Sequence, residues 1–342
     1  MSEKKTILIT GGAGFIGSNF VPYFCEKYPQ YNVINLDKLT YAGNLDNLSE
    51  CKDMKNYQFI HGDICNDELV NNLFDKYDIR GVIHFAAESH VDNSITGPRA
   101  FVNTNIIGTF NLLDAARRHW MEKPGLVKPE YKTSRFHHIS TDEVYGALGK
   151  DGFFKETTPY APNSPYSASK ASSDFLVRSY NHTYGMNVTT SNCSNNYGPK
   201  QHHEKLIPLI ISNALAGKHL PIYGTGENVR DWLYVLDHCR AIDLIFHNGR
   251  AGETYNIGGH NEKNNITIVK RICEILDKKQ PRLDGHKYSE QITFVNDRAG
   301  HDFRYAIDAS KIESELGWRA KETFDTGIVK TVEWYLNKQK TK

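Results

Sequence analysis

A tyrosine and a lysine four residues apart, Tyr166 and Lys170, are the pair in this chain best suited to proton transfer. On a helix, positions four apart share one face, so the phenol and the ammonium can project into one cleft. A free tyrosine is a poor base at neutral pH because its pKa is about 10. A positive charge at ~4 Å in a partly screened site is worth about 4 kcal/mol, or roughly three pKa units. We therefore predict that Lys170 makes a tyrosinate accessible near pH 7.

A hydroxyl and two carboxyl groups stand shortly before this pair, at Thr141, Asp142 and Glu143. A base, a hydroxyl, an acid and a second base together suit an oxidation that is coupled to proton transfer. An isolated Tyr-x-x-x-Lys pair is most often an ordinary exposed helix pair. The chemical interpretation therefore depends on the elements that surround these residues.

A glycine-rich turn between a predicted strand and a predicted helix indicates a dinucleotide site. Thr6–Thr10 is a short β-branched run, typical of a strand that is buried on both faces. Gly11-Gly12-Ala13-Gly14-Phe15-Ile16-Gly17 follows, and a helical pattern begins at Phe15. The glycines permit a tight turn and the close approach of a pyrophosphate, while the helix N-terminus supplies N–H groups and a positive dipole.

An acidic residue follows the second predicted strand, residues 33–36. Asp37 lies about twenty residues after Gly17, where a carboxylate binds ribose hydroxyls and repels a 2′-phosphate. We therefore expect NAD rather than NADP as the cofactor. Lys38 is a counter-signal, because a cation at this position could tolerate the extra phosphate.

Strands and helices continue to alternate through the first half of the chain. We predict strands at 57–61, 82–87 and 135–139, and helices at 67–77 and 98–120. This alternation predicts an α/β fold with a doubly wound, Rossmann-type parallel sheet, which binds ligands at the carboxyl ends of its strands. The strand at 135–139 delivers Thr141, Asp142 and Glu143 to that edge, so the acids and the tyrosine-lysine pair should converge there.

After about residue 199 the alternation becomes less regular. Helical patterns at 206–216, 235–248 and 268–278 are separated by loops rich in Gly and Asn. We predict a Rossmann domain with the catalytic residues over 1–199 and a smaller α/β substrate lobe over 200–342. The boundary is approximate, and we expect the chain to cross between the lobes. Arg230 and Arg298 suit a diphosphate because guanidinium forks match phosphate oxygens; the alternative for each is a surface ion pair.

The composition fits a globular protein and argues against disorder and against nucleic-acid or membrane binding. The chain has 342 residues, of which 39% are hydrophobic and 24% charged, which argues against disorder. The net charge of +1 gives no support for a nucleic-acid or membrane-surface partner. The six cysteines form no C-x-x-C motif, no apolar run approaches membrane-spanning length, and no signal peptide is apparent, so we expect a cytoplasmic protein.

Two further patterns concern assembly and metals. The helix at 100–116 is apolar on more than one face, so it should pack on both sides, against its own sheet and against either a second subunit or a loop of the same chain. The pairs His137-His138 and His202-His203 lack the flanking Cys, Asp or Glu spacing of a metal site, so we expect no metal.

Gly11-x-x-Gly14-x-x-Gly17 and Tyr166-x-x-x-Lys170 resemble, in the same order, the two signatures of the extended short-chain dehydrogenase/reductase family of nucleotide-sugar enzymes. The more selective Asp142-Glu143 pair after Thr141 resembles the sugar-nucleotide 4,6-dehydratases of that family. The chain departs from the usual pattern where His202-His203 replaces an aromatic-proline pair and where Ala299 replaces a proline. The similarity runs nearly end to end and includes residues 86–92, 192–199, 230–235 and 255–259.

The resemblance implies a lyase of deoxysugar biosynthesis that converts dTDP-glucose to its 4-keto-6-deoxy product with tightly bound NAD. Tyr166, assisted by Lys170, takes the O4 proton as hydride leaves C4, while Thr141 holds that oxygen. Glu143 then removes the C5 proton, Asp142 protonates the departing C6 hydroxyl, and hydride returns to C6. The two carboxyl groups must hold opposite protonation states, which neighbouring like charges can enforce.

The resemblance also implies the binding residues and the assembly. The expected assembly is a homodimer through the helices near 100–116 and 166–184. The residues implied for NAD are Gly11, Gly14, Phe15, Ile16, Gly17, Asp37, Lys38, Leu39, Thr40, Asp63, Ile64, Ala86, Ala87, Ser89, Thr104, Tyr166, Lys170 and Asn196. Those implied for the nucleotide sugar are Ser89, Thr141, Asn195, Lys205, Leu206, Pro221, Ile222, Tyr223, Arg230, Asn265, Arg298 and His301.

Two alternatives remain open. A UDP-sugar C4 epimerase or decarboxylase of the same family would share the fold and the tyrosine-lysine pair, but such enzymes generally lack an acid pair after the threonine. A non-catalytic NAD-binding sensor or scaffold would share the fold alone. The intact Thr141, Tyr166 and Lys170 argue against this second alternative.

Overall fold

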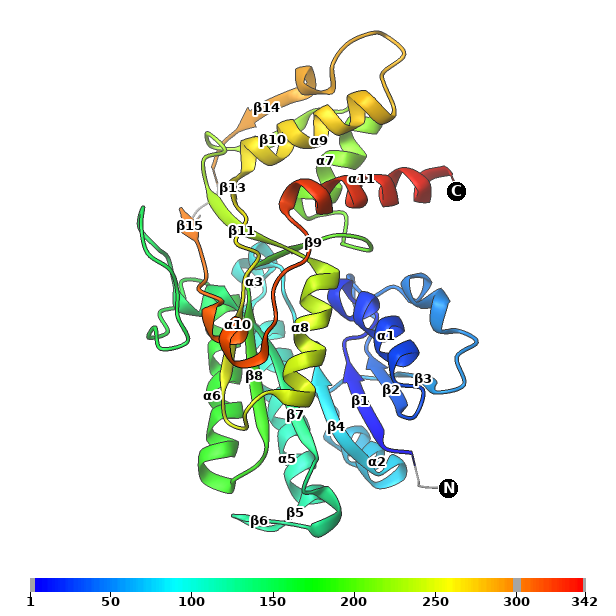
Figure 1. Cartoon of the computed structure of the whole chain (residues 1–342), viewed down its shortest axis with the longest axis vertical. Helices are drawn as coiled ribbons and strands as arrows, with labels where there is room; N and C mark the ends of the chain where they lie inside the picture. Colours follow the sequence, from blue (N-terminus) through cyan, green and yellow to red (C-terminus); the bar gives the residue numbers. More distant parts are fainter. Residues whose placement is uncertain (1–3, 298–302, 341–342) are drawn as a thin grey trace.

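A seven-stranded, fully parallel sheet is the largest feature of the computed structural model, which describes residues 4–297 and 303–340 (Figure 1). The strand order is β12-β8-β7-β4-β1-β2-β3. Their bounds are β1 Thr6–Thr10, β2 Asn32–Asp37, β3 Tyr57–His61, β4 Ile79–His84, β7 Arg135–Thr141, β8 Val188–Cys193 and β12 Thr254–Ile257. The predicted α/β, doubly wound class is confirmed.

Helices cover both faces of this sheet because its strands are apolar on both faces. On β1, Ile7 and Ile9 pack with α1 (Phe15–Lys27) and α8 (Val235–Asn248). Leu8, which points the opposite way, packs with α2 (Asp67–Tyr77), α5 (Thr109–Trp120) and α6 (Pro165–Tyr184). Helix α2 has the same bounds as the helix predicted at 67–77.

The strand predicted at 82–87 and the helix predicted at 98–120 differ most from the structure. Strand β4 begins and ends three residues before the predicted run of 82–87, so Ala86 and Ala87 follow the strand instead of belonging to it. The helix predicted over 98–120 has three parts, α4 (Pro98–Phe101), the π-helix η2 (Val102–Gly108) and α5. In η2, the Asn105 side chain bonds both backbone groups of Glu88 and the Ser169 hydroxyl, which ties this helix to the loop after β4 and to α6.

Residues after 199 contribute both to the core around the large sheet and to a second core. A second core contains α7 (Leu206–Leu215), α9 (Asn265–Lys279), α11 (Phe324–Lys340) and β10 (Leu220–Tyr223), which pairs with β14 (Ile292–Val295). By contrast, β12 is an edge strand of the large sheet, on which α8 and α10 (Ser310–Leu316) pack. Figure 1 shows the second core above the sheet. The chain passes between the two cores more than once. The boundary at 199/200 is therefore a proposed division between cofactor binding and substrate binding.

The remaining elements connect these parts. Strand β11 (Val229–Tyr234) pairs with β9 (Asn195–Tyr197), β13 (Glu262–Asn264) and β15 (Arg304–Tyr305). Residues 121–134, predicted as a surface insertion, contain the hairpin of β5 (Met121–Lys123) and β6 (Leu126–Val127) and the turn η3 (Pro129–Tyr131). The other short helices are η1 (Leu45–Cys51), α3 (Val91–Thr96), η4 (Asp142–Tyr145) and η5 (Tyr288–Gln291). Over the described ranges, no helix has both the length and the apolar character needed to cross a membrane.

Candidate active site

The turn between β1 and α1 forms a narrow backbone cradle. Gly11 has a φ of +72°, and a Cβ there would lie 2.5 Å from the backbone nitrogen of Ala86. A Cβ at Gly17 would lie 2.3 Å from the carbonyl oxygen of Gly11. Helix α1 begins after Gly14 without a side-chain cap, so its first-turn N–H groups are not satisfied by a capping side chain. This arrangement fits a pyrophosphate.

Asp37, the last residue of β2, contacts the backbone of this turn. Its carboxylate accepts hydrogen bonds from the backbone N–H groups of Ala13 and Leu39, both at 2.8 Å. Lys38, the counter-signal for a 2′-phosphate, forms an ion pair of 2.7 Å with Asp63. Burial acts to raise the pKa of Asp63, but the hydrogen bond from Lys38 lowers it overall. The charge of Lys38 therefore already has a partner, which favours the NAD interpretation.

A cleft of about 320 Å³ runs along the carboxyl ends of the strands. All five predicted catalytic residues line it, and the glycine cradle lines it as well. The structure thus brings together chain segments that are far apart in the sequence. Of the residues predicted for NAD, all but Leu39 line this cleft; of those predicted for the sugar nucleotide, the lining includes Ser89, Thr141, Asn195 and Lys205.

The two acids follow β7 in the short helix η4, and Thr141 positions them. Its hydroxyl oxygen accepts from the backbone N–H of Glu143 at 3.3 Å, and its hydroxyl donates to Asp142 Oδ1 at 3.4 Å. Asp142 is buried, whereas Glu143 is partly exposed. Burial, then Glu143 and Asp231, raise the pKa of Asp142 well above its ordinary value. Asp142 therefore favours its protonated form.

Helix α6 places Tyr166 and Lys170 against these acids. Ser164 caps the helix in a reciprocal pair with Ser167, and Pro165 occupies the first helical position. Tyr166 and Lys170 therefore lie in the first two turns, on one face, and both side chains are buried. The phenol shares a hydrogen bond with the hydroxyl of Thr141.

The sequence predicted that Lys170 lowers the pKa of the Tyr166 phenol to near 7. For the protein without its ligands, this prediction is wrong. Burial, followed by the charge of Glu143, raises the pKa of Tyr166 well above 10, and the hydrogen bond with Thr141 only partly opposes this shift. The Lys170 ammonium donates to the carbonyl oxygen of Ile139 at 2.8 Å, and burial lowers its own pKa to about 8. The phenol is therefore neutral until another positive charge enters the cleft.

A buried polar network, which the sequence did not predict, lies behind Lys170. Its Nζ is 3.5 Å from His138 Nε2, and that nitrogen is 3.1 Å from Asp174 Oδ1. The hydroxyls of Ser140 and Tyr160 donate to the other oxygen of Asp174 at 2.9 and 3.0 Å. Burial raises the pKa of Asp174 to about 7, and the Asp174 charge acts to raise the pKa of Lys170. The sequence did offer one signal for this network, because Asp174 lies four residues after Lys170 and so shares its face of α6.

Several predicted substrate residues do not line the cleft. They belong to the second core or to β11 and comprise Leu206, Pro221, Ile222, Tyr223, Arg230 and Asn265. Arg298 and His301 lie outside the described residues. Conversely, Tyr41, Glu88, His90, Cys193, Ser194, Gln201, His202 and Glu204 line the cleft without having been predicted to bind a ligand. Four of these eight fall within residues 86–92 and 192–199, the segments on which the family resemblance partly rested.

A dinucleotide cradle, a tyrosine-lysine pair on a helix and an acid pair at the same sheet edge define an enzyme of the short-chain dehydrogenase/reductase class. Residues 8–331 match the model of the family described as GDP-mannose 4,6 dehydratase, and the chain belongs to this family.

Several similar proteins are also named as 4,6-dehydratases. A relative from Salmonella typhimurium, named dTDP-glucose 4,6-dehydratase, is 57% identical over 339 residues, which cover 96% of this chain and 92% of the relative. The crystal structure of the dTDP-glucose 4,6-dehydratase from Bacillus anthracis, in complex with NAD, is 47% identical with a TM-score of 0.85. The enzyme of the same name from Streptomyces venezuelae, also with NAD bound, is 44% identical with a TM-score of 0.87. Each structural match covers 98% of both chains.

Proposed function

We propose that the protein is a sugar-nucleotide 4,6-dehydratase that converts dTDP-glucose to dTDP-4-keto-6-deoxyglucose and water. The observation that carries this proposal is the acid pair in the cleft. Asp142 is buried with a raised pKa, beside the partly exposed Glu143. Elimination needs one carboxyl group that gives a proton and one that takes a proton, and this pair offers both. Close relatives bear the name of this activity.

The chain's residues fit NAD. The turn of Gly11 to Gly17 and the N-terminus of α1 hold the pyrophosphate, and Asp37 binds the adenosine ribose. Bound NAD supplies a hydride acceptor for C4, a donor for C6, and a positive charge on its nicotinamide. That charge is of the sign needed to lower the raised pKa of Tyr166.

The proton steps follow from the positions of four side chains. Tyr166 takes the proton of O4, with the Thr141 hydroxyl beside that oxygen, and Glu143 takes and later returns the C5 proton. Asp142 gives its proton to the C6 hydroxyl, which leaves as water. The O4 proton must therefore reach Asp142 in every turnover. Thr141 hydrogen-bonds to both Tyr166 and Asp142, which suits this transfer.

The nucleotide diphosphate binds next to β11, beyond the residues that line the cleft. Arg230 is buried there, its guanidinium lies 4.4 Å from the ring centre of Tyr305, and its charge acts on the Asp142 carboxyl. A cation in this place suits a diphosphate partner. We assign the remaining predicted contacts to the nucleotide on the family resemblance: Leu206, Pro221, Ile222, Tyr223, Asn265, Arg298 and His301.

The proposed assembly is a homodimer through the helices near 100–116 and 166–184, the second of which is α6. Val102, Ile107, Phe110 and Phe175 are large apolar residues on these helices, and all four are exposed in the single chain. Helices α5 and α6 also lie against each other. Apolar side chains gathered on adjacent helices are a common feature of an interface between subunits. All six cysteines are free thiols, which supports the expected cytoplasmic location.

A substrate panel tests the proposal. The protein is incubated separately with dTDP-, UDP-, CDP- and GDP-glucose, and each product is identified by mass spectrometry. We expect dTDP-glucose to lose the mass of one water, with the other nucleotides turned over more slowly. A product of unchanged mass from UDP-glucose would instead support the epimerase alternative, and no turnover of any sugar would support a binding protein.

A further inference from the structure

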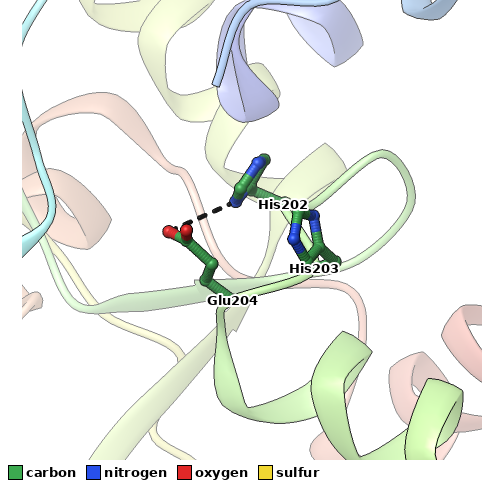
Figure 2. A group of neighbouring side chains, drawn as sticks. All are labelled: His202, His203 and Glu204. Carbon is green, nitrogen blue, oxygen red and sulfur yellow. Dashed lines mark ion pairs between the residues drawn. The ribbon is translucent and has the colours of Figure 1, made fainter. Parts of the chain in front are cut away.

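The imidazole and carboxylate groups of three consecutive residues lie next to one another (Figure 2). His202, His203 and Glu204 follow one another in the loop between β9 and α7, and one ligand-type atom of each lies within 4.8 Å of the others. His202 and Glu204 also line the cleft. Within residues 4–297 and 303–340, no other group of three or more His, Cys, Asp or Glu residues has this spacing.

A fourth side chain reaches this cluster from a different loop. His90 stands before α3, and its Nε2 lies 3.5 Å from Glu204 Oε2. His202 Nδ1 lies 3.5 Å from the same oxygen. Two ligands bound at ~2.0–2.1 Å to one tetrahedral zinc ion lie about 3.3 Å apart. Both nitrogen-oxygen pairs are therefore close to the separation that a shared metal ion requires.

Aromatic contacts position the two imidazole rings. The ring of Tyr41 meets the His202 ring edge-on, with 5.5 Å between the ring centres. The centres of the His202 and His203 rings are 4.2 Å apart.

In place of the expectation that the His202-His203 pair binds no metal, we propose that His90, His202, His203 and Glu204 form a site for Zn²⁺ or a similar divalent ion. Imidazole and carboxylate ligands suit zinc, copper and nickel more than magnesium or calcium. His90 belongs to the loop after β4, whereas the other three ligands belong to the loop before α7. A bound ion joins these two loops at the edge of the cleft and slows the exchange of the ligand inside. This second part rests on the proposed function, which makes NAD that ligand.

Calorimetry tests the site without reference to activity. Cofactor-loaded protein is treated with a chelator, dialysed and titrated with ZnCl₂. We expect one tight equivalent in the wild type and at least about tenfold weaker binding in H202A/H203A. H202F/H203P, which restores an aromatic-proline pair, provides a second variant and should show the same loss.

The matched control is H260A/H286A, which removes two exposed histidines that each pair with a single carboxylate at 2.7 Å. This variant should bind zinc like the wild type. The site is overturned if the wild type binds no more tightly than H202A/H203A and H202F/H203P, or if the control variant loses as much affinity.

The rate of NAD release tests the link between the loops. Release is followed from the amount of NAD that stays bound after gel filtration at successive times, with and without ZnCl₂. Zinc should slow release about twofold or more in the wild type but not in H90A, which keeps three ligands on one loop. Equal slowing in H90A, or none in the wild type, contradicts the link. Failure of dehydration alone would refute the proposed function and leave the calorimetric result in place.

Discussion

The two carboxyl groups beside Thr141 differ in burial, and this difference assigns their roles. Asp142 keeps its proton because burial and the neighbouring acids raise its pKa. Glu143 is partly exposed, so it does not share the full burial that favours the protonated form of Asp142. The family resemblance had assigned the proton to Asp142 and the base role to Glu143, but the burial that favours this assignment comes from the fold.

Replacement of Asp142 by Asn should slow the elimination step selectively. The amide keeps the shape of the side chain but has no acidic proton for the leaving hydroxyl, and general acids typically contribute about 10²–10⁴-fold. Oxidation at C4 should persist, so that reduced-nicotinamide absorbance accumulates after dTDP-glucose is added. Equal loss of the oxidation and elimination steps would remove the role assigned to this residue.

Replacement of Asp174 by Asn should shift the alkaline limb of the pH–rate profile to lower pH. The Asp174 carboxylate acts to raise the pKa of Lys170, which burial lowers to about 8. Without that negative charge, Lys170 loses its proton at a lower pH, while the amide oxygen can still accept from Ser140 and Tyr160. The measurement is kcat/KM from pH 6 to 10 for this variant and for D114N, whose carboxylate pairs with Arg117 instead. An unchanged limb in D174N would show that the network does not act through Lys170.

At the scale of elements, the turn between β1 and α1 determines whether a cofactor can bind. Gly17→Ala should abolish or strongly weaken NAD binding, because the new Cβ would lie 2.3 Å from the carbonyl oxygen of Gly11. Gly149→Ala is the matched control, since a Cβ there meets no atom within 4 Å. NAD retention after gel filtration is the measurement, with thermal unfolding as a check of folding. Wild-type retention in G17A would contradict the cradle.

Local patterns predicted the elements better than they predicted side-chain partners. The strand at Thr6–Thr10 and helices α2 and α8 have the predicted bounds, because periodicity and glycine position specify them locally. The joining of β12 to the large sheet and the π-helical η2 depend on contacts between distant segments. For the same reason, the spacing of Tyr166 and Lys170 gave their shared face but not the contact of Lys170 with Ile139. Burial, which raises the pKa of Tyr166, likewise comes from the whole fold.

At the scale of the whole molecule, the proposed dimer should depend on the exposed apolar side chains of α5 and α6. Phe110→Glu combined with Phe175→Glu should shift the protein from dimer to monomer, because both charges would be buried in the interface. Light scattering coupled to gel filtration measures the mass. Leu283→Glu, which changes a fully exposed leucine elsewhere, should leave the mass unchanged. A dimer that persists in the double variant would place the interface on another surface.

The central claim is that one cleft oxidises C4, eliminates water and reduces C6 within a single catalytic cycle. The most direct measurement is to supply dTDP-glucose that carries deuterium at C4 and to locate the label in the product by mass spectrometry and NMR. The account predicts a 4-keto-6-deoxy product with the deuterium in its C6 methyl group and no net consumption of NAD. A product that has lost water without deuterium at C6, or a sugar that keeps its C6 hydroxyl, would contradict it.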